Sequence, residues 1–199
     1  NDFVMVDARN LTRNWSKLAL DICNRHTGVG CDSLIIILNS QKADLGMRTF
    51  DADGSEAETC GNGIRCVARY ALEKGLIERD AEEMTVETIS AVNRVKFEKK
   101  DGKVVKLWAN MGKPRLAADE IPVILKSGNG SCVQNGMISQ KLHASDTELT
   151  LNLVSMGNPH AVHFLKDSVA DFPMYKVGPI VEKNTIFPHG MNFEVARVI

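Results

Sequence analysis

The sequence lacks an excess of charge of either sign. Its 199 residues include 24 Lys and Arg and 25 Asp and Glu, a formal net charge of −1, with no basic block. Nucleic acid and membrane surfaces are therefore not expected as partners. The chain also has no apolar run near the roughly 20 residues of a membrane helix, and from its first residues we expect no signal peptide. The remaining composition, 44% apolar and 25% charged, is typical of a globular protein with one large or two small domains.

Cysteine is present, but in no pattern typical of disulfide frameworks or metal sites. The five cysteines are Cys23, Cys31, Cys60, Cys66 and Cys132. Their number is odd, no CxxC pair occurs, and none falls into zinc-ligand spacing. We therefore predict free thiols, a cytoplasmic location where thiols stay reduced, and no metal.

The apolar patterns predict a mixed α+β fold in which strands outnumber helices. Helical spacing predicts a helix at about 13–25 and a second one that follows Cys60. A hairpin turn is expected at Lys100-Asp101-Gly102, and residues 167–171 are expected to start a short helix or turn. Apolar or alternating segments predict strands at 3–6, 34–38, 47–50, 84–89, 92–97, 104–108, 121–125, 136–142, 149–156, 161–165 and 192–199. Met111–Pro114 is the expected boundary, which gives domains 1–110 and 111–199.

The most informative segment is Cys60-Gly61-Asn62-Gly63, at the start of an amphipathic helix. Gly75 stands where a C-terminal cap belongs. The positive end of a helix favours the thiolate form of a cysteine, and its open N–H groups favour an anion. The segment thus predicts a thiolate beside a carboxylate-sized site, with a buried structural cysteine as the alternative. The expected apolar face of the helix comprises Ile64, Val67, Ala68, Ala71 and Leu72.

Four segments together resemble one family, the cofactor-independent diaminopimelate epimerases. They are Asn1–Phe3, Arg25–Asp32, Phe50–Cys66 and Ser155–His160, in the family's order, and Phe187-Pro188 and Asn192 fit its next motif. The resemblance implies two pseudo-symmetric lobes, each a strongly curved mixed sheet around a central helix, with the substrate in the cleft between them. It implies interconversion of LL- and meso-diaminopimelate in lysine and peptidoglycan-precursor biosynthesis. No pyridoxal phosphate or metal takes part, and family members are commonly homodimers.

The resemblance also implies roles for individual residues. Cys60 would be one of two thiols that exchange protons on opposite faces of the substrate's α-carbon. Gly61 and Asn62 would offer N–H groups to the reacting carboxylate. His160 is a candidate to accept or donate a proton near Cys60, with a structural histidine as the alternative. The further substrate-binding positions are Asn1, Asp51, Asn158 and Asn192.

The chain departs from the family's pattern in three ways. It begins inside the family's Gly-Asn-Asp-Phe motif, and it stops before the Glu-Arg pair and the Ala-Cys-Gly-Thr-Gly segment that carries the second catalytic cysteine. Asp51 occupies a position where the family usually has asparagine, and a carboxylate accepts hydrogen bonds but cannot donate them. We therefore expect a chain truncated at both ends, with an incomplete second lobe and no activity by itself.

Three alternatives to the epimerase remain at this stage. A proline-racemase-like isomerase would use related chemistry, but such enzymes tend to have Cys-Gly-His where this chain has Cys60-Gly61-Asn62. A thiol hydrolase would require an acyl-enzyme on Cys60. A catalytically incompetent fragment would act only as a folded binding lobe.

Overall fold

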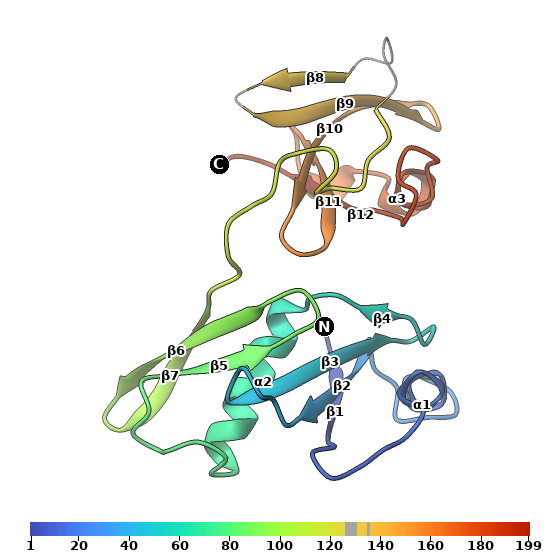
Figure 1. Ribbon diagram of the computed structural model, residues 1–199. Helices are drawn as coiled ribbons and strands as arrows, with labels where there is room; N and C mark the ends of the chain where they lie inside the picture. Colours follow the sequence, from blue (N-terminus) through green and yellow to red (C-terminus); the bar gives the residue numbers. More distant parts are fainter. Residues whose placement is uncertain (126–130, 135) are drawn as a thin grey trace. The chain divides into compact units, whose positions relative to one another are not determined.

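The computed structural model describes residues 1–125, 131–134 and 136–199. Its internal contacts divide the chain into two units, Asn1–Gly112 and Lys113–Ile199 (Figure 1). The first unit contains helices α1 (Trp15–Ile22) and α2 (Gly61–Glu73) and strands β1 (Phe3–Asp7), β2 (Ser33–Leu38), β3 (Leu45–Asp51), β4 (Glu56–Ala57), β5 (Glu83–Glu87), β6 (Val92–Lys100) and β7 (Lys103–Ala109). The second unit contains β8 (Ser131–Gln134), β9 (Met137–Ala144), β10 (Thr147–Ser155), β11 (Pro159–Phe164), β12 (Asn192–Ala196), the 3₁₀ turn Val169–Asp171 and α3 (Met174–Glu182).

The sheet of the first unit has the order β1-β2-β3-β5-β6-β7, and β4 pairs with β3. Strand β2 is covered on both faces, which explains its unbroken apolar run. Ile35 and Ile37 belong to the core that includes α2, whereas Leu34 and Ile36 belong to the core that includes Trp15 of α1. The two helices therefore cover opposite faces of the sheet at β2.

Helix α2 shows the predicted apolar face. Its buried residues are Gly63, Ile64, Val67, Ala68 and Ala71, and Leu72 is half-buried. The helix ends at Glu73 with Lys74 as the C-cap, and Gly75, the residue predicted at this end, follows with a left-handed φ of +65°. The N–H of Leu76 donates to the Ala71 carbonyl at 2.8 Å and that of Gly75 to Leu72 at 3.3 Å, the paired bonds of a Schellman cap.

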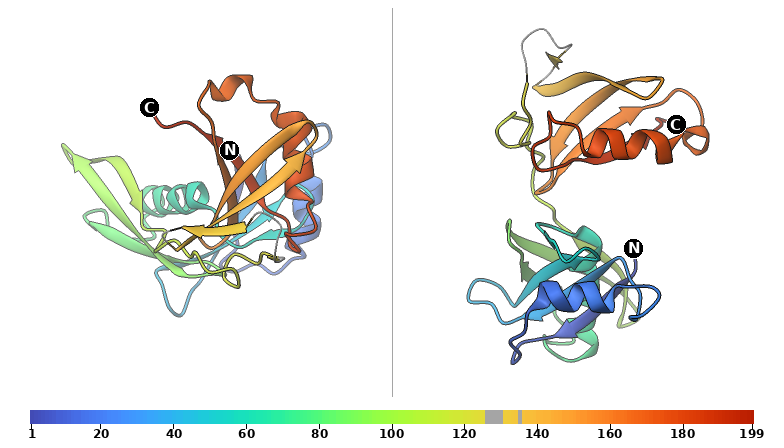
Figure 2. Two further views of the ribbon diagram at one scale, coloured as in Figure 1. Left: turned by 90° about the horizontal axis from the view of Figure 1, so that it is seen from above. Right: turned by 90° about the vertical axis from the view of Figure 1, so that its right-hand side faces the viewer.

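The second unit is a five-stranded sheet in the order β12-β11-β10-β9-β8. Strands β11 and β12 pair in parallel, and β10 is antiparallel to both β9 and β11. Figure 2 (right) shows α3 lying along this sheet. Its Val177 and Val181, one helical turn apart, are fully buried with Leu149, Leu151 and Leu153 of β10.

The mixed α+β class is confirmed, and most predicted strands are present within one to three residues at each end. The predicted hairpin turn is also confirmed: Asp101 and Gly102 have φ of +51° and +71°, and Lys100 pairs with Lys103. These angles fit the two-residue type I′ turn that suits the twist of the strands.

One expected strand is wrong, and one helix was not expected. Residues 121–125 form no strand, because the Ile121 N–H donates to Ala117 and the Val123 N–H to Ala118 in local turns. The apolar character of this segment reflects burial instead, since Ile121 is fully buried. Helix α3 was not predicted, because Gly178 and Pro179 lie inside it and both residues are poor helix formers.

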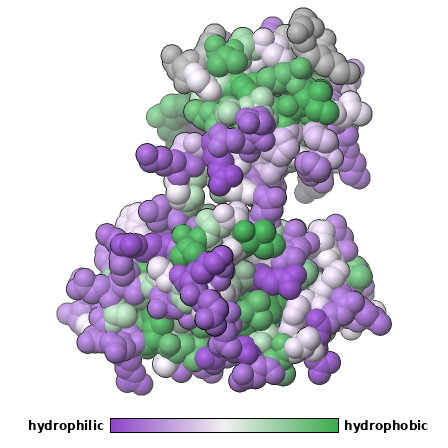
Figure 3. All heavy atoms as spheres, viewed as in Figure 1, coloured by the Kyte–Doolittle hydropathy of each residue, from purple (hydrophilic) through white to green (hydrophobic). Residues whose placement is uncertain are grey.

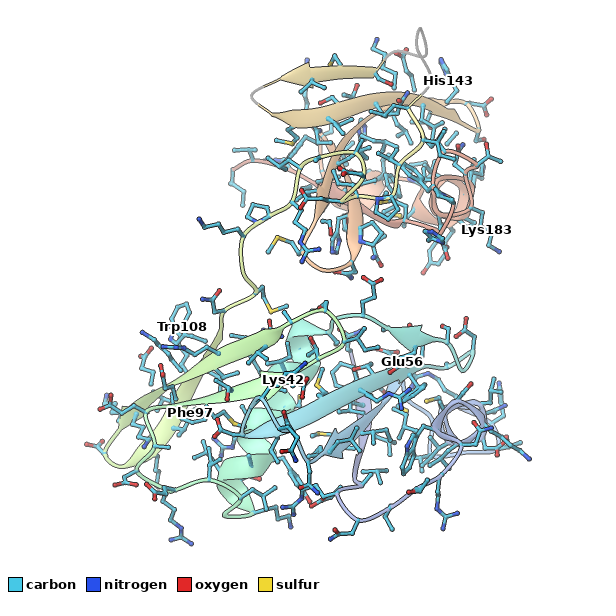
Figure 4. The ribbon with its side chains drawn as sticks, in the orientation of Figure 1. Lys42, Glu56, Phe97, Trp108, His143 and Lys183 are labelled. Carbon is cyan, nitrogen blue, oxygen red and sulfur yellow. The ribbon has the colours of Figure 1, made fainter. Side chains whose placement is uncertain are left out.

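The surface of each unit mixes residue types. Figure 3 shows apolar atoms interspersed with hydrophilic ones on the viewed face of both units. Trp108, on edge strand β7, is 56% exposed, and its indole N–H donates to Glu98 at 3.0 Å; Figure 4 labels this side chain. Among the described residues, no helix combines the length and the apolarity needed to cross a membrane.

Candidate active site

Cys60 is the N-cap of α2. Its backbone is extended, with φ −133° and ψ 98°, and its carbonyl accepts the Ile64 N–H at 2.9 Å. The half-buried Sγ accepts the N–H of Gly63 at 3.4 Å. The predicted position of this thiol at the positive end of a helix is therefore present in the structure.

Two glycines let the chain pack closely around this thiol. A Cβ on Gly63 would lie 2.9 Å from Cδ1 of Ile35 and 3.4 Å from Sγ of Cys60. A Cβ on Gly61 would lie 3.3 Å from Sδ of Met111. Position 63 therefore has no room for a side chain unless α2 moves away from β2 or Ile35 shifts.

The segment that leads into Cys60 is held at two points. In the hairpin of β3 and β4, the Arg48 guanidinium donates to Oε2 of Glu56 at 2.7 Å; Figure 4 labels Glu56. The hydroxyl of Thr59 shares a hydrogen bond with that of Ser90, in the loop after β5. These contacts fix the approach of the chain to the helix cap.

Asn1 and Asn62, two predicted site residues 61 positions apart, are in direct contact. The Asn62 Nδ2 donates to Asn1 Oδ1 at 2.8 Å, and the Arg65 guanidinium donates to Asn62 Oδ1. Asn1 Nδ2 in turn donates to Asp32 Oδ2 at 3.3 Å. The fold thus brings Asn1, Asn62 and Cys60 to one end of α2.

A cluster of ion pairs holds the segment next to Asn1 in place. The Arg25 guanidinium donates to both carboxylate oxygens of Asp2, at 2.9 and 3.0 Å, and to Asp32 at 2.8 Å. Its hydrogen bonds hold the pKa of the Asp2 carboxyl well below its usual range. Because Asp2 and Asp32 also exchange backbone-to-carboxylate bonds, the loop carrying Arg25 is tied to the start of β1.

Asp51 is held by a residue that the sequence did not single out. Ser33 pairs with Asp51 across β2 and β3, and its Oγ donates to Asp51 Oδ1 at 2.7 Å. Ser33 is 6% exposed, so this bond lies at the edge of the core. Nothing in the residues around position 33 indicates this role, because it depends on the register of the two strands.

The remaining predicted residues lie in the second unit. His160 of β11 is in register with Asn192 of β12, and the Asn192 Nδ2 donates to the Pro159 carbonyl at 2.9 Å. The two ring nitrogens of His160 both have partners: Nδ1 lies 2.7 Å from Oε1 of Glu194, and Nε2 lies 2.9 Å from Oδ1 of Asn158. Glu194 was not predicted as a site residue, because its contact with His160 depends on the register of β11 and β12.

A second cysteine on α2 has different surroundings. Cys66 lines a pocket of about 600 Å³ together with Phe3, Asn62, Tyr70 and Leu107. Burial raises the pKa of its thiol, and the neighbouring Cys60 adds to the effect. Cys60 does not line this pocket. All five cysteines are free thiols, and within the described parts of the chain no three His, Cys, Asp or Glu side chains are grouped to hold a metal.

Known proteins match the chain over its whole length. The family model named "Diaminopimelate epimerase" matches residues 1–117. A diaminopimelate epimerase of Methanococcus maripaludis is 36% identical over 200 residues, which cover 100% of this chain and 69% of the relative. That of Moorella thermoacetica is 40% identical over 201 residues, covering 100% of this chain and 68% of the relative.

Solved structures share the fold at low sequence identity. A probable proline racemase from Agrobacterium radiobacter, with bound carbonate, has a TM-score of 0.56 and 17% identity over 84% of this chain and 42% of that chain. A hydroxyproline epimerase from Agrobacterium vitis, with bound trans-4-hydroxy-L-proline, has a TM-score of 0.56 and 15% identity over 85% and 45%. The two relatives found by sequence are 36% and 40% identical to this chain, and both are named diaminopimelate epimerase. Together with the family model, they show that this chain belongs to the diaminopimelate epimerase family.

Proposed function

We propose that this protein interconverts LL- and meso-diaminopimelate by moving a proton at the α-carbon, without pyridoxal phosphate. The observation that carries the proposal is the position of Cys60. It caps α2 with its Sγ on the Gly63 N–H, inside the region that the family model matches. The positive end of a helix favours the thiolate form of a cysteine, which is the form that can remove a proton.

The chemistry needs one acid-base group on each face of the α-carbon. In one direction a Cys60 thiolate takes the α-proton and becomes a thiol, while a second thiol gives a proton to the other face and becomes a thiolate. Each positioned acid or base contributes roughly 10²–10⁴-fold. The resemblance assigns the second thiol to an Ala-Cys-Gly-Thr-Gly segment, which this sequence does not contain.

Removal of the α-proton leaves negative charge on the adjacent carboxylate. The first turn of a helix leaves N–H groups without intrahelical partners, and at α2 those groups belong to Gly61 and Asn62. We propose that they donate to the substrate carboxylate and stabilise the charge as it develops. The positive end of the helix adds to this effect.

The polar side chains would select the substrate. In the first unit, Asn1 and Asp51 are proposed to hold its amino and carboxylate groups. On the family motif, Asn158 and Asn192 are also assigned to substrate binding, and His160 to proton transfer. An unpaired buried polar group costs about 1–3 kcal/mol, so such residues would discriminate against simple amino acids that lack the second polar centre.

The family also suggests the wider setting. We propose that the reaction serves lysine and peptidoglycan-precursor biosynthesis, and that the protein is a homodimer. The five free thiols support a reducing cytoplasm as its location.

The test is solvent-deuterium exchange at the α-carbon. The 199-residue chain and a polypeptide extended to the length of its relatives are each incubated with LL-diaminopimelate in D₂O. The extended protein is expected to give deuterated meso product, and the 199-residue chain is expected to give none. Absence of exchange in the extended protein would reject the epimerase, and exchange into proline instead would favour the racemase alternative.

A further inference from the structure

A row of hydrogen bonds between side chains crosses the start of α2 and joins three segments of the first unit. The Arg65 guanidinium donates to Oδ1 of Asn62. Nδ2 of Asn62 donates to Oδ1 of Asn1 at 2.8 Å, and Nδ2 of Asn1 donates to Oδ2 of Asp32 at 3.3 Å. We call these four residues the hydrogen-bond row.

The two ends of the row determine the direction of every bond in it. The oxygen and the nitrogen of an asparagine amide can exchange places by a flip of the side chain. A guanidinium can only donate, however, and an ionised carboxylate can only accept. Arg65 therefore requires the oxygen of Asn62. Asp32, which also accepts from Arg25 at 2.8 Å, requires the nitrogen of Asn1. Both requirements agree on the middle bond, in which Asn62 donates to Asn1.

A flip of either amide would place like groups against each other. A flipped Asn62 would turn its N–H groups toward the Arg65 guanidinium, and a flipped Asn1 would turn its oxygen toward the Asp32 carboxylate. Either arrangement loses a hydrogen bond to a charged group. Because Asn1 and Asn62 are both exposed, packing restricts their amides little, and the charged ends of the row select the orientation.

We propose that Arg65 is a positioning residue, which holds the side-chain amide of Asn62 in one orientation and, through it, that of Asn1. The functional part of this inference rests on the proposed function, since it takes both asparagines as residues at the substrate. An amide nitrogen carries two hydrogens, and the row uses one on each asparagine. Within the described residues each second hydrogen has no acceptor, so it can donate to a substrate carboxylate. Arg65 itself touches no reacting atom in the proposal.

The first measurement is the orientation of the two amides, which does not depend on activity. The full-length protein is labelled with ¹⁵N-asparagine, and the side-chain signals are assigned with Asn1→Ala and Asn62→Ala. In wild type, an Nδ2 hydrogen of Asn62 is expected to show a nuclear Overhauser effect to the side chain of Asn1. Arg65→Met, which keeps an apolar stem but cannot donate, should weaken this effect and shift the side-chain signals of both asparagines.

Two further variants separate this role from a general effect on the helix. Arg69→Met removes an arginine one turn further along α2, which pairs with Glu73 at 2.6 Å, and should leave both amides unchanged. Arg65→Lys keeps a cationic donor and should restore the wild-type signals, because the contact with Asn62 uses a single guanidinium nitrogen. Unchanged asparagine signals in Arg65→Met would overturn the proposal. So would an Nδ2 hydrogen of Asn62 that lies against Arg65 in wild type.

The second measurement is exchange of the α-proton of diaminopimelate by the full-length protein. Arg65→Met should raise KM by about tenfold, the loss of one hydrogen bond between an amide and a substrate carboxylate, with a smaller change in kcat. Arg65→Lys should recover most of this loss. Reoriented amides with an unchanged KM would remove Arg65 from substrate binding. If wild type exchanges nothing, the proposed function fails, and the spectra still decide whether Arg65 orients the amides.

Discussion

The two units hold their proposed proton-transfer groups in different ways. In the first unit, the Cys60 thiol is held by the backbone, through the Gly63 N–H at the start of α2. In the second, His160 is held by side chains, those of Glu194 and Asn158. A site held by the backbone depends on the path of the chain and on the packing that sets this path, whereas a site held by side chains depends on the identity of each partner.

The largest expected effect concerns the thiol itself. Cys60→Ala should lower epimerisation by at least about 10²–10⁴-fold, the contribution of one positioned acid-base group, with the fold intact. Cys66→Ala on the same helix is the matched control and should retain activity. Deuterium exchange in the full-length protein measures both, and equal activity of the two variants would refute the role of Cys60.

Gly63→Ala tests how far the site around Cys60 depends on the path of the backbone. The new Cβ would meet Ile35 Cδ1 at 2.9 Å, and overpacking of a core costs about 1–3 kcal/mol. Urea unfolding should show this loss of stability. In the second unit, Gly178→Ala would meet nothing closer than 3.4 Å, so it should be neutral or stabilise α3 by up to about 1 kcal/mol.

The core on the α1 side of the first unit's sheet, which contains Cys23, predicts a sensitivity to alkali. Burial, with a hydrogen bond to Cys31, raises the pKa of Cys23 to about 12, whereas an unfolded cysteine has a pKa of about 8.5. Above that pH the unfolded chain loses a proton that the folded chain keeps, so stability falls as pH rises. The loss should be roughly 1–2 kcal/mol between pH 8 and pH 10.

Tryptophan fluorescence can follow this loss in the first unit alone, because Trp15 and Trp108 both lie there. Cys23→Ser should flatten the dependence on pH, since a serine hydroxyl does not ionise in this range. An equally steep decline in Cys23→Ser would show that another group is responsible.

The smallest expected effect concerns Asp51. Asp51→Asn introduces the residue that the resemblance makes usual at this position and would replace the proposed charge-assisted contact to the substrate by a neutral one, a difference of about 1 kcal/mol. KM for diaminopimelate should rise by about fivefold, with stability nearly unchanged. Ser33→Ala, which removes the 2.7 Å bond to Asp51, should instead lower stability by about 1 kcal/mol, and steady-state kinetics with urea unfolding separate the two.

Periodic patterns predicted most of the fold. The face of α2 and the alternating strands could be read from the sequence because side-chain burial repeats with the period of each element. Helix α3 was not predicted because Gly178 and Pro179 interrupt its apolar pattern. The strand expected at 121–125 was wrong because apolar residues can be buried in a turn as well as in a sheet.

Local signals alone predicted the site only within one segment, and the family resemblance supplied the predicted residues that lie elsewhere in the chain. Cys60, Gly61 and Asn62 are neighbours in the sequence, so their position at a helix start could be inferred from local signals. Ser33 and Glu194 could not, since each gains its role from a residue on another strand. Register depends on how two strands pair, so the sequence of one strand alone does not predict it.

The close approach of α2 to β2 at Gly63 links the position of the Cys60 sulfur to the packing of the hydrophobic core. Ile35 is fully buried, and its Cδ1 lies against the first turn of α2 at Gly63. This side chain therefore limits how closely the start of the helix can approach β2. A change in the size of this buried side chain is therefore expected to move Cys60 and, under the proposed function, to change the rate of turnover.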